Sequence, residues 1–144
     1  MQTKNLVILS SLGAVAYFAA AFWLKTAYHP VLPANAPKVS GDIVLLQRPF
    51  RVFSDSAFAA IANDTLFYKD ADSADNTTRS AIELYEDEKP LGPAHSVHRD
   101  VGTIGQGRFS HWRFAYSMFL FSSSDNTDPN TNGRNYWAVR PPAH

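Results

Sequence analysis

The sequence contains no cysteine in its 144 residues. This absence excludes disulfide frameworks, zinc sites with thiolate ligands, iron–sulfur clusters and cysteine nucleophiles. The chain also has no excess of either charge, because 13 Lys and Arg side chains balance 13 Asp and Glu side chains. A neutral chain has no general electrostatic reason to bind nucleic acid, so we expect no nucleic-acid partner.

Familiar catalytic signatures are missing as well. The sequence has neither the G-x-S-x-G turn of serine hydrolases nor the HExxH motif of zinc proteases. Gly105-Gln106-Gly107 is too short for a phosphate-binding loop and has no strand–helix–strand context. We therefore predict a protein that is not an enzyme and that carries no cofactor.

Charged side chains are also missing from residues 5–24, which read NLVILSSLGAVAYFAAAFWL. A helix of about twenty residues spans roughly 30 Å, the thickness of the hydrocarbon core of a membrane. The run is long for the apolar part of a cleaved signal peptide, which is the alternative. The pattern predicts a transmembrane anchor over residues 1–28. Four residues on one face are candidates for packing against another membrane helix: Gly13, Ala16, Tyr17 and Ala20.

The predicted anchor sets the expected location of the rest of the chain. A short N-terminal tail before a larger domain is typical of a signal anchor that exports the domain. We therefore predict a single-pass protein of a bacterial inner membrane, with residues 41–144 on the periplasmic side. Residues 29–40 contain three prolines and are predicted to form an extended linker.

Residues 41–144 mostly show the composition and alternation of β-strands. Turn-rich stretches separate the runs, which favours an antiparallel β-sandwich or a jelly-roll-like domain, and hence a mainly β fold behind the anchor helix. Strands are expected within residues 42–53, 66–69, 80–86, 108–122 and 135–139. Short helices are expected at residues 56–63 and 96–104, the second with Ser96 as its cap and Gly105 at its end.

Three histidines lie close together in the sequence: His95, His98 and His111, with Asp100 nearby. These residue types can bind zinc, copper or iron if their side chains converge. Isolated histidines more often bond to the backbone or to a neighbouring carboxylate. We therefore predict no metal site.

The polar loop of residues 122–135 reads SSSDNTDPNTNGRN. Its residues 128–133 match the first half of a calcium-binding loop, in which alternating oxygen ligands precede a glycine. The match then fails, because Val139 stands where a bidentate glutamate belongs. Asx turns that end in an Asn132-Gly133 hairpin turn explain the loop without a ligand.

Aromatic and polar side chains together leave carbohydrate binding open. Trp112 and Arg113 can stack on a sugar ring, although the aromatic residues of this segment also suit the core of a small sandwich. The candidate ligand-binding residues are Trp112, Arg113, Asp125, Asp128, Asn130, Asn132 and Arg134.

Three phrases within residues 86–136 are KPLGPAHSVH, GQGRFSHW and FSSSDNTDPNTNGRNY. They resemble a segment of uncharacterised bacterial envelope proteins, some of them linked to polysaccharide assembly. The resemblance covers about a third of the chain, and it implies an extracytoplasmic β-domain and favours a glycan as ligand. In layout, the chain is similar to single-span accessory subunits of photosynthetic and respiratory electron-transport complexes.

The main functional expectation is a non-catalytic, single-span accessory subunit. It would brace or assemble a larger bacterial membrane complex of the photosynthetic reaction-centre, light-harvesting or respiratory type. Its partners would be the integral membrane subunits of that complex and the lipid bilayer. The alternative is a membrane-anchored carbohydrate-binding module of the cell envelope.

Overall fold

A computed structural model describes residues 2–27, 32–53 and 56–142, with side chains from residue 13 onward in these ranges. The chain divides into two compact units, Met1–Pro33 and Ala34–His144. The second unit begins inside the range assigned to the linker, because Ala36 packs against Tyr85 and Trp137. Residues 1 and 28–31, which the anchor and linker predictions include, lie outside the described residues.

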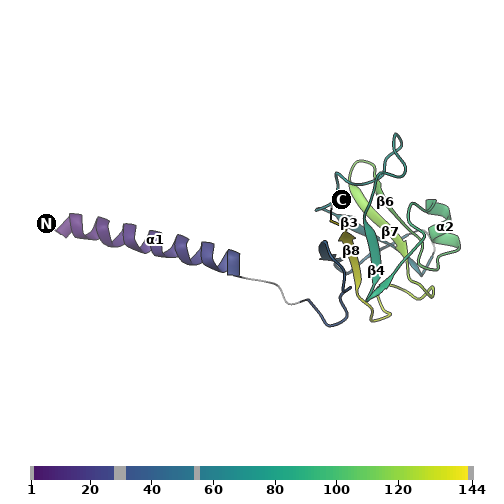
Figure 1. The fold of residues 1–144 in the computed structure, drawn as a ribbon, viewed down its shortest axis with the longest axis horizontal. Coiled ribbons are helices and arrows are strands. Elements are labelled where there is room, and N and C mark those ends of the chain that lie inside the picture. The colour runs from purple at the N-terminus through teal and green to yellow at the C-terminus, as the bar shows by residue number, and fades with distance from the viewer. Residues whose placement is uncertain (1, 28–31, 54–55, 143–144) are drawn as a thin grey trace. The chain divides into compact units, whose positions relative to one another are not determined.

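The first unit contains one helix, α1 (Gln2–Ala27), drawn in purple in Figure 1. In the part of the chain that the structure describes, no helix has both the length and the apolar character needed to cross a membrane. The predicted transmembrane anchor is therefore contradicted, and so is the predicted single-pass localisation in a bacterial inner membrane with a periplasmic domain.

The second unit contains two antiparallel sheets of four strands each. The first sheet has the order β1 (Asp42–Leu45), β8 (Tyr136–Arg140), β4 (Glu83–Glu86) and β5 (Lys89–Pro90). The second has the order β2 (Arg51–Val52), β3 (Ala59–Asp64), β7 (Ser117–Ser122) and β6 (Phe109–Arg113). The β part of the predicted fold class is thus confirmed, as two antiparallel sheets packed as a sandwich.

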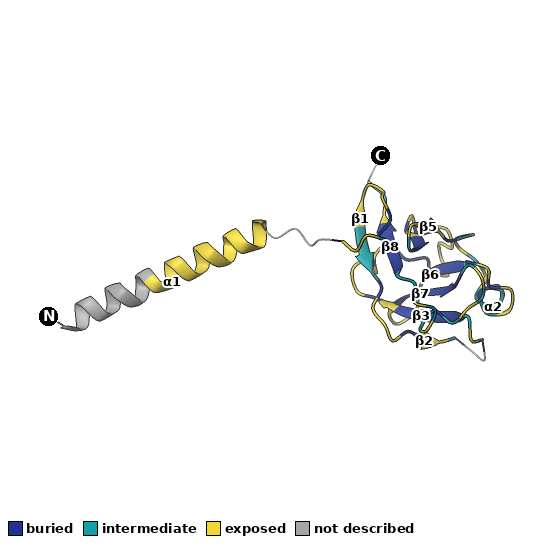
Figure 2. Ribbon diagram, turned by 90° about the horizontal axis from the view of Figure 1, so that it is seen from below, coloured by how far each residue is buried: buried dark blue, intermediate teal, exposed yellow. Residues whose placement is uncertain are grey.

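Strand alternation explains how the sheets pack. Side chains from both sheets meet in the central core, including Leu84 and Ala138 of the first sheet and Phe119 and Phe121 of the second. The alternate residues of β8 pack on the other face of their sheet, where the segment around Ala36 covers them. Because neighbouring residues of a strand point to opposite faces, such fully buried strands need apolar side chains on both faces. Figure 2 shows β3, β6, β7 and β8 as buried.

The outer face of the second sheet is covered by helix α2 (His98–Thr103). Val101 of α2 is fully buried against Ala59 and Leu120. The helix begins two residues after the predicted start, and Ser96 does not cap it, because its Oγ donates to the carbonyl oxygen of Pro93. As predicted, the helix ends just before Gly105. The φ of Gly105 is +66°, which suits glycine.

Two local predictions are wrong. Residues 56–63 are not a helix, because residues 59–64 form β3 and pair along their whole length with β7. Residues 66–69 are not a strand. The carboxylate of Asp64 accepts hydrogen bonds from the backbone N–H groups of Leu66 and Phe67, which turns the chain there.

Candidate functional site

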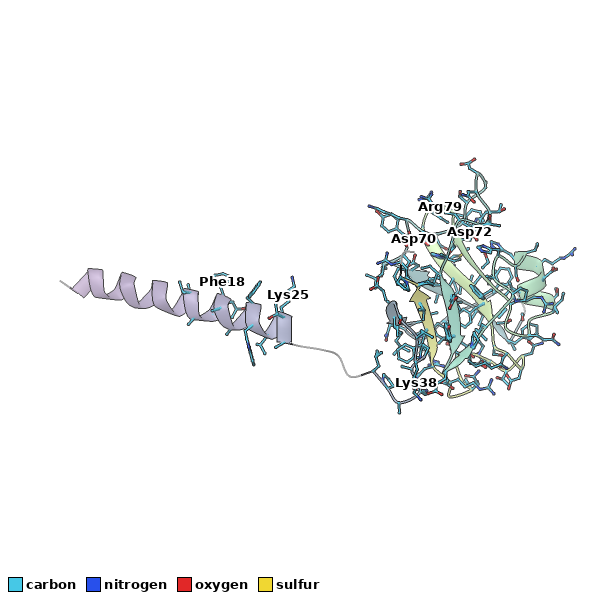
Figure 3. The ribbon with its side chains drawn as sticks, in the orientation of Figure 1. Phe18, Lys25, Lys38, Asp70, Asp72 and Arg79 are labelled. Atoms are coloured by element: carbon cyan, nitrogen blue, oxygen red, sulfur yellow. The ribbon has the colours of Figure 1, made fainter. Side chains whose placement is uncertain are left out.

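Strand β6 lies at the edge of its sheet, and a loop segment pairs with its free side. The N–H of Asp72 donates to the carbonyl oxygen of His111 at 2.9 Å, and the N–H of Arg113 donates to that of Asp72 at 2.9 Å. This short parallel bridge fixes Asp72 beside β6 (Asp72 is labelled in Figure 3). The backbone pairing therefore sets the position of the carboxylate.

A second segment pairs with the same edge at the start of β6. The N–H of Phe109 donates to the carbonyl oxygen of Pro93 at 3.2 Å, and the N–H of Ser96 donates to that of Phe109 at 3.0 Å. His95 lies between these two contacts and has a left-handed backbone, with φ of 53°. Non-glycine residues held in this conformation cluster at active sites and ligand-binding sites, although Asp87, Gln106 and Asn126 outside the groove share it.

A cavity of about 540 Å³ lies where both segments meet β6, and we call it the Trp112 groove. Its apolar wall consists of Val97, Trp112 and Phe114. Its polar wall consists of Asp72, Thr77, Thr78, His95, Ser96, His98 and Ser110. Ser110 and Trp112 are two residues apart on β6, so both point to the groove face of the sheet.

The aromatic rings of the groove pack on one another at steep angles. The ring centroids of His98 and Trp112 are 5.6 Å apart at 88°, and those of Trp112 and Phe114 are 6.0 Å apart at 59°. Trp112 is half-buried, whereas Phe114 is 67% exposed and Val97 is 65% exposed. The apolar wall is therefore open to a ligand.

A carboxylate–imidazole pair forms the polar centre of the groove. Asp72 is 1% exposed, and its Oδ2 lies 2.6 Å from Nδ1 of His95. Its Oδ1 accepts a hydrogen bond of 2.7 Å from the backbone N–H of Ser80. A carboxylate only accepts, so Nδ1 of His95 carries the proton of this hydrogen bond. Nε2 of His95 then remains available, on a side chain that is 30% exposed.

His98 is the second imidazole of the groove. Its Nε2 lies 3.3 Å from Oγ of Ser110. Burial lowers the pKa of His98 below its usual value of 6.5, so the ring is neutral at pH 7. The groove therefore combines a neutral imidazole with the His95–Asp72 pair.

His111 is not part of the groove. It is 1% exposed and points to the opposite face of β6, where its ring stacks on Phe119 at 4.3 Å. Its Nε2 lies 3.1 Å from Oδ2 of Asp64 and 3.1 Å from Oγ of Ser117, and its Nδ1 lies 2.7 Å from Oγ of Ser80. Both ring nitrogens are thus used inside the core.

The carboxylate of Asp64 responds to this environment in two opposing ways. Burial alone would raise the pKa of Asp64. The hydrogen bonds from His111, from the backbone N–H of Phe67 and from Ser117 outweigh burial, so the pKa is lowered. Asp64 is therefore an anion in the core at neutral pH.

The three histidines do not converge. Each has its own partner, and Asp100 is 3.5 Å from Nε of Arg99 instead. Among the residues that the structure describes, no group of three metal-ligating side chains is close enough to hold an ion.

The loop of residues 122–135 uses its polar side chains to hold its own shape. Arg134 forms a double hydrogen bond to Asp125, at 2.9 and 2.5 Å, and this contact lowers the pKa of Asp125. Asp128 accepts from the N–H of Asn130 at 2.8 Å, and Asn132 accepts from the N–H of Arg134 at 3.1 Å. These are the predicted Asx turns, but the predicted hairpin is wrong, because the flanking strands β7 and β8 belong to different sheets.

Asn130 joins this loop to a distant segment. Its Oδ1 accepts from the N–H of Phe50 at 2.8 Å, and its Nδ2 donates to the carbonyl oxygen of Phe50 at 3.1 Å. The side-chain amide thus replaces a backbone partner. Of the seven predicted ligand-binding residues, Trp112 lines the groove, and Arg113 and the five loop residues do not.

The predicted helix-packing residues of α1 are all exposed: Gly13, Ala16, Tyr17 and Ala20. Nothing in the described structure lies within 4 Å of a Cβ built on Gly13.

Sequence reasoning missed Asp72, Ser110 and Phe114 as groove residues. The spacing of Ser110, Trp112 and Phe114 at every second position was a usable signal, because such residues share a face of a strand. Asp72 carried no such signal. It reaches the groove through a bridge to a strand some forty residues away along the chain.

No protein-family model, curated protein or solved structure matches this chain.

Proposed function

We propose that residues 34–144 form a binding domain whose Trp112 groove binds a neutral carbohydrate. The observation that supports this proposal is one open cavity that aromatic side chains and hydrogen-bonding groups line together. Small-molecule sites typically combine apolar and aromatic lining with a few convergent polar groups. A sugar ring presents the matching surfaces, with C–H groups on its faces and hydroxyl groups around its edge.

The charges of the groove favour a neutral ligand. Among its described lining residues there is no lysine or arginine, which an anionic ligand would require. The carboxylate of Asp72 is buried, and it is already bonded to His95 and to the N–H of Ser80. It therefore leaves little free charge to attract a cation.

The polar wall suits hydroxyl groups. Nε2 of His95 can accept a hydrogen bond from a sugar hydroxyl, because Nδ1 is fixed as the donor to Asp72. The hydroxyl groups of Thr77, Thr78 and Ser110 can donate or accept.

The proposal is tested by screening the full chain against a panel of neutral oligosaccharides and measuring the affinity of the best ligand. Phe114→Ala should weaken binding about tenfold or more, which is about 1.4 kcal/mol of lost ring contact. Tyr68→Ala is the matched control, because Tyr68 is an exposed aromatic residue that does not line the groove. Failure of every oligosaccharide to bind would refute the proposal, as would equal losses in the two variants.

A second function is favoured by α1. Its large apolar side chains, including Phe18, Phe22 and Trp23, are 65–70% exposed (Phe18 is labelled in Figure 3). Contiguous exposed apolar surface of this kind marks an interaction site. We propose that α1 packs against a partner protein, so that the chain is an accessory subunit of a larger assembly.

Size separation of the native assembly, followed by mass spectrometry, tests this second proposal. The wild-type chain should migrate with a larger complex, and Phe18→Gln with Phe22→Gln should release it. Migration of the wild-type chain as a free 16.0 kDa species would refute the proposal.

A further inference from the structure

We infer that the His95–Asp72 pair is a general base and that the groove hydrolyses an O-acyl ester carried by the bound carbohydrate. This inference rests on the proposed function for the choice of substrate. It goes beyond that function because it assigns a reaction to the site.

The first argument is the contrast between two histidines that each contact a buried aspartate. His111 is 1% exposed, and both of its nitrogens have partners in the core, which is the arrangement of a structural histidine. His95 has a buried carboxylate on Nδ1 at 2.6 Å. Among the described residues, nothing bonds to its Nε2. A base that is oriented on one nitrogen and free on the other is ready to take a proton from a bound molecule.

The second argument is how rigidly the pair is held. The carboxylate of Asp72 is bonded on both oxygens, to His95 and to the N–H of Ser80. The backbone of Asp72 is bonded to β6 through its N–H and its carbonyl oxygen. His95 has a left-handed backbone between two hydrogen-bonded contacts to the same strand. Both partners are therefore fixed to one edge of the sheet, which orients the imidazole before a ligand binds.

The third argument is the reaction that these groups can support. Glycoside hydrolysis needs two carboxyl groups at the bond to be cleaved, and Asp72 is the one carboxylate among the described groove residues. Phosphate esters need cationic side chains to stabilise the transition state, and the described lining has none. Hydrolysis of a carboxylic ester needs a base that takes a proton from the attacking water, and hydrogen-bond donors that stabilise the oxyanion. The hydroxyl group of Thr78, an exposed residue that lines the groove, is such a donor, whereas Ser110 is buried with its Oγ 3.3 Å from Nε2 of His98.

The reaction is a balanced hydrolysis without a redox step. His95 Nε2 takes a proton from a water molecule, and the water oxygen bonds to the acyl carbon. The tetrahedral intermediate collapses, the bond between the acyl carbon and the sugar oxygen breaks, and that oxygen takes the proton back from His95. The products are a carboxylic acid and a free sugar hydroxyl. Asp72 acts as a positioning residue that stabilises the imidazolium formed in the first step.

The test uses the full chain with acetylated xylan, and acetate release is measured. Wild-type protein should release acetate with saturation kinetics. His95→Gln should lower kcat by about 100-fold or more, since general-base catalysis contributes about 10²–10⁴-fold. His95→Asn is the second variant, because asparagine tolerates the left-handed backbone better than most residues. Asp72→Asn should lower kcat with little change in KM and should alter the pH profile of kcat.

A binding measurement on the same samples separates the two proposals. Binding of neutral oligosaccharide without acetate release would overturn the catalytic inference and leave the proposed function standing. Release from acetylated xylan that depends on His95 would support both proposals, and a chain that neither binds oligosaccharide nor releases acetate would overturn both. Release that is equal in wild type and in both His95 variants would overturn the inference.

Discussion

Replacing His111 with phenylalanine should destabilise the β-domain by about 3 kcal/mol. His111 is 1% exposed and contacts Asp64, Ser80 and Ser117 through its two ring nitrogens. Phenylalanine has nearly the same shape but cannot form hydrogen bonds. The substitution therefore removes polar contacts and keeps the packing against Phe119.

The magnitude follows from what the variant leaves behind. The side chain of Asp64 is 2% exposed, and removing one hydrogen bond to a buried charged group costs about 1.5–3 kcal/mol. Asp64 still accepts hydrogen bonds from the N–H groups of Leu66 and Phe67, which reduces this cost. Ser80 and Ser117 each lose a contact, at about 1 kcal/mol apiece. The greater apolar surface of phenylalanine offsets about 1–2 kcal/mol.

The assay is urea unfolding of the full chain at pH 7, followed by tryptophan fluorescence, since Trp137 is 1% exposed in the core. At roughly 4 °C per kcal/mol, the same loss lowers Tm by about 12 °C. His98→Phe is the control, because His98 is half-buried and makes one side-chain hydrogen bond at 3.3 Å; its cost should stay below about 1 kcal/mol.

A double-mutant cycle identifies the charge of Asp64 as the cause. Asp64→Asn removes the charge and keeps an oxygen for the N–H groups of Leu66 and Phe67. The double variant with His111→Phe should therefore be less destabilised than the sum of the single variants, by about 1 kcal/mol or more. A His111→Phe variant as stable as wild type, or strict additivity in the cycle, would refute this reasoning.

Three further outcomes are expected. Gly105→Ala should cost about 3 kcal/mol or more in urea unfolding, because the φ of Gly105 is +66° and a Cβ there would lie 2.6 Å from the ring of Phe58. Gly133→Ala is the control, with a φ of +75° and free space around the new Cβ, and it should cost about 1 kcal/mol. Asn130→Ala should cost about 2 kcal/mol by the same assay, since the N–H and carbonyl oxygen of a buried backbone lose their partners, and an unchanged midpoint would contradict this. Lowering the pH from 7 to 5 should reduce the free energy of unfolding more in the wild-type protein than in His98→Phe. The pKa of His98 is lowered in the fold, so from about pH 6.5 downward the unfolded chain binds a proton before the folded chain does. This proton uptake favours the unfolded state. Equal losses in the two proteins would count against a buried neutral imidazole.

Much of the β-domain could be predicted from the sequence because the signals are local. The run from Tyr136 to Val139 alternates between two buried faces, and the residues of strands β6 and β7 show the same periodicity. The Asx turns of residues 125–134 also join residues close in sequence, through the acceptors of Asp125, Asp128 and Asn132. Interactions between near neighbours require no knowledge of the rest of the chain.

Local sequence patterns gave wrong predictions for two segments. The alanine-rich stretch Ala59–Asp64 suits a helix by composition, yet its six residues pair with β7 and fill narrow space on both faces of the sheet. The apolar run of residues 5–24 predicted a transmembrane span that the described part of α1 does not provide.

Patterns along the chain were enough to predict antiparallel strands and to name Trp112 as a candidate for ligand contact. The polar groups that accompany Trp112 are set by the folding of distant segments against one another. His95 and Asp72 are 23 residues apart and meet because both of their segments bond to the free edge of β6. His111 follows Ser110 directly but points to the opposite face of the strand, so it belongs to the core and not to the groove. Strand pairing between distant segments places these groups, and no pattern along the chain records which segments will pair.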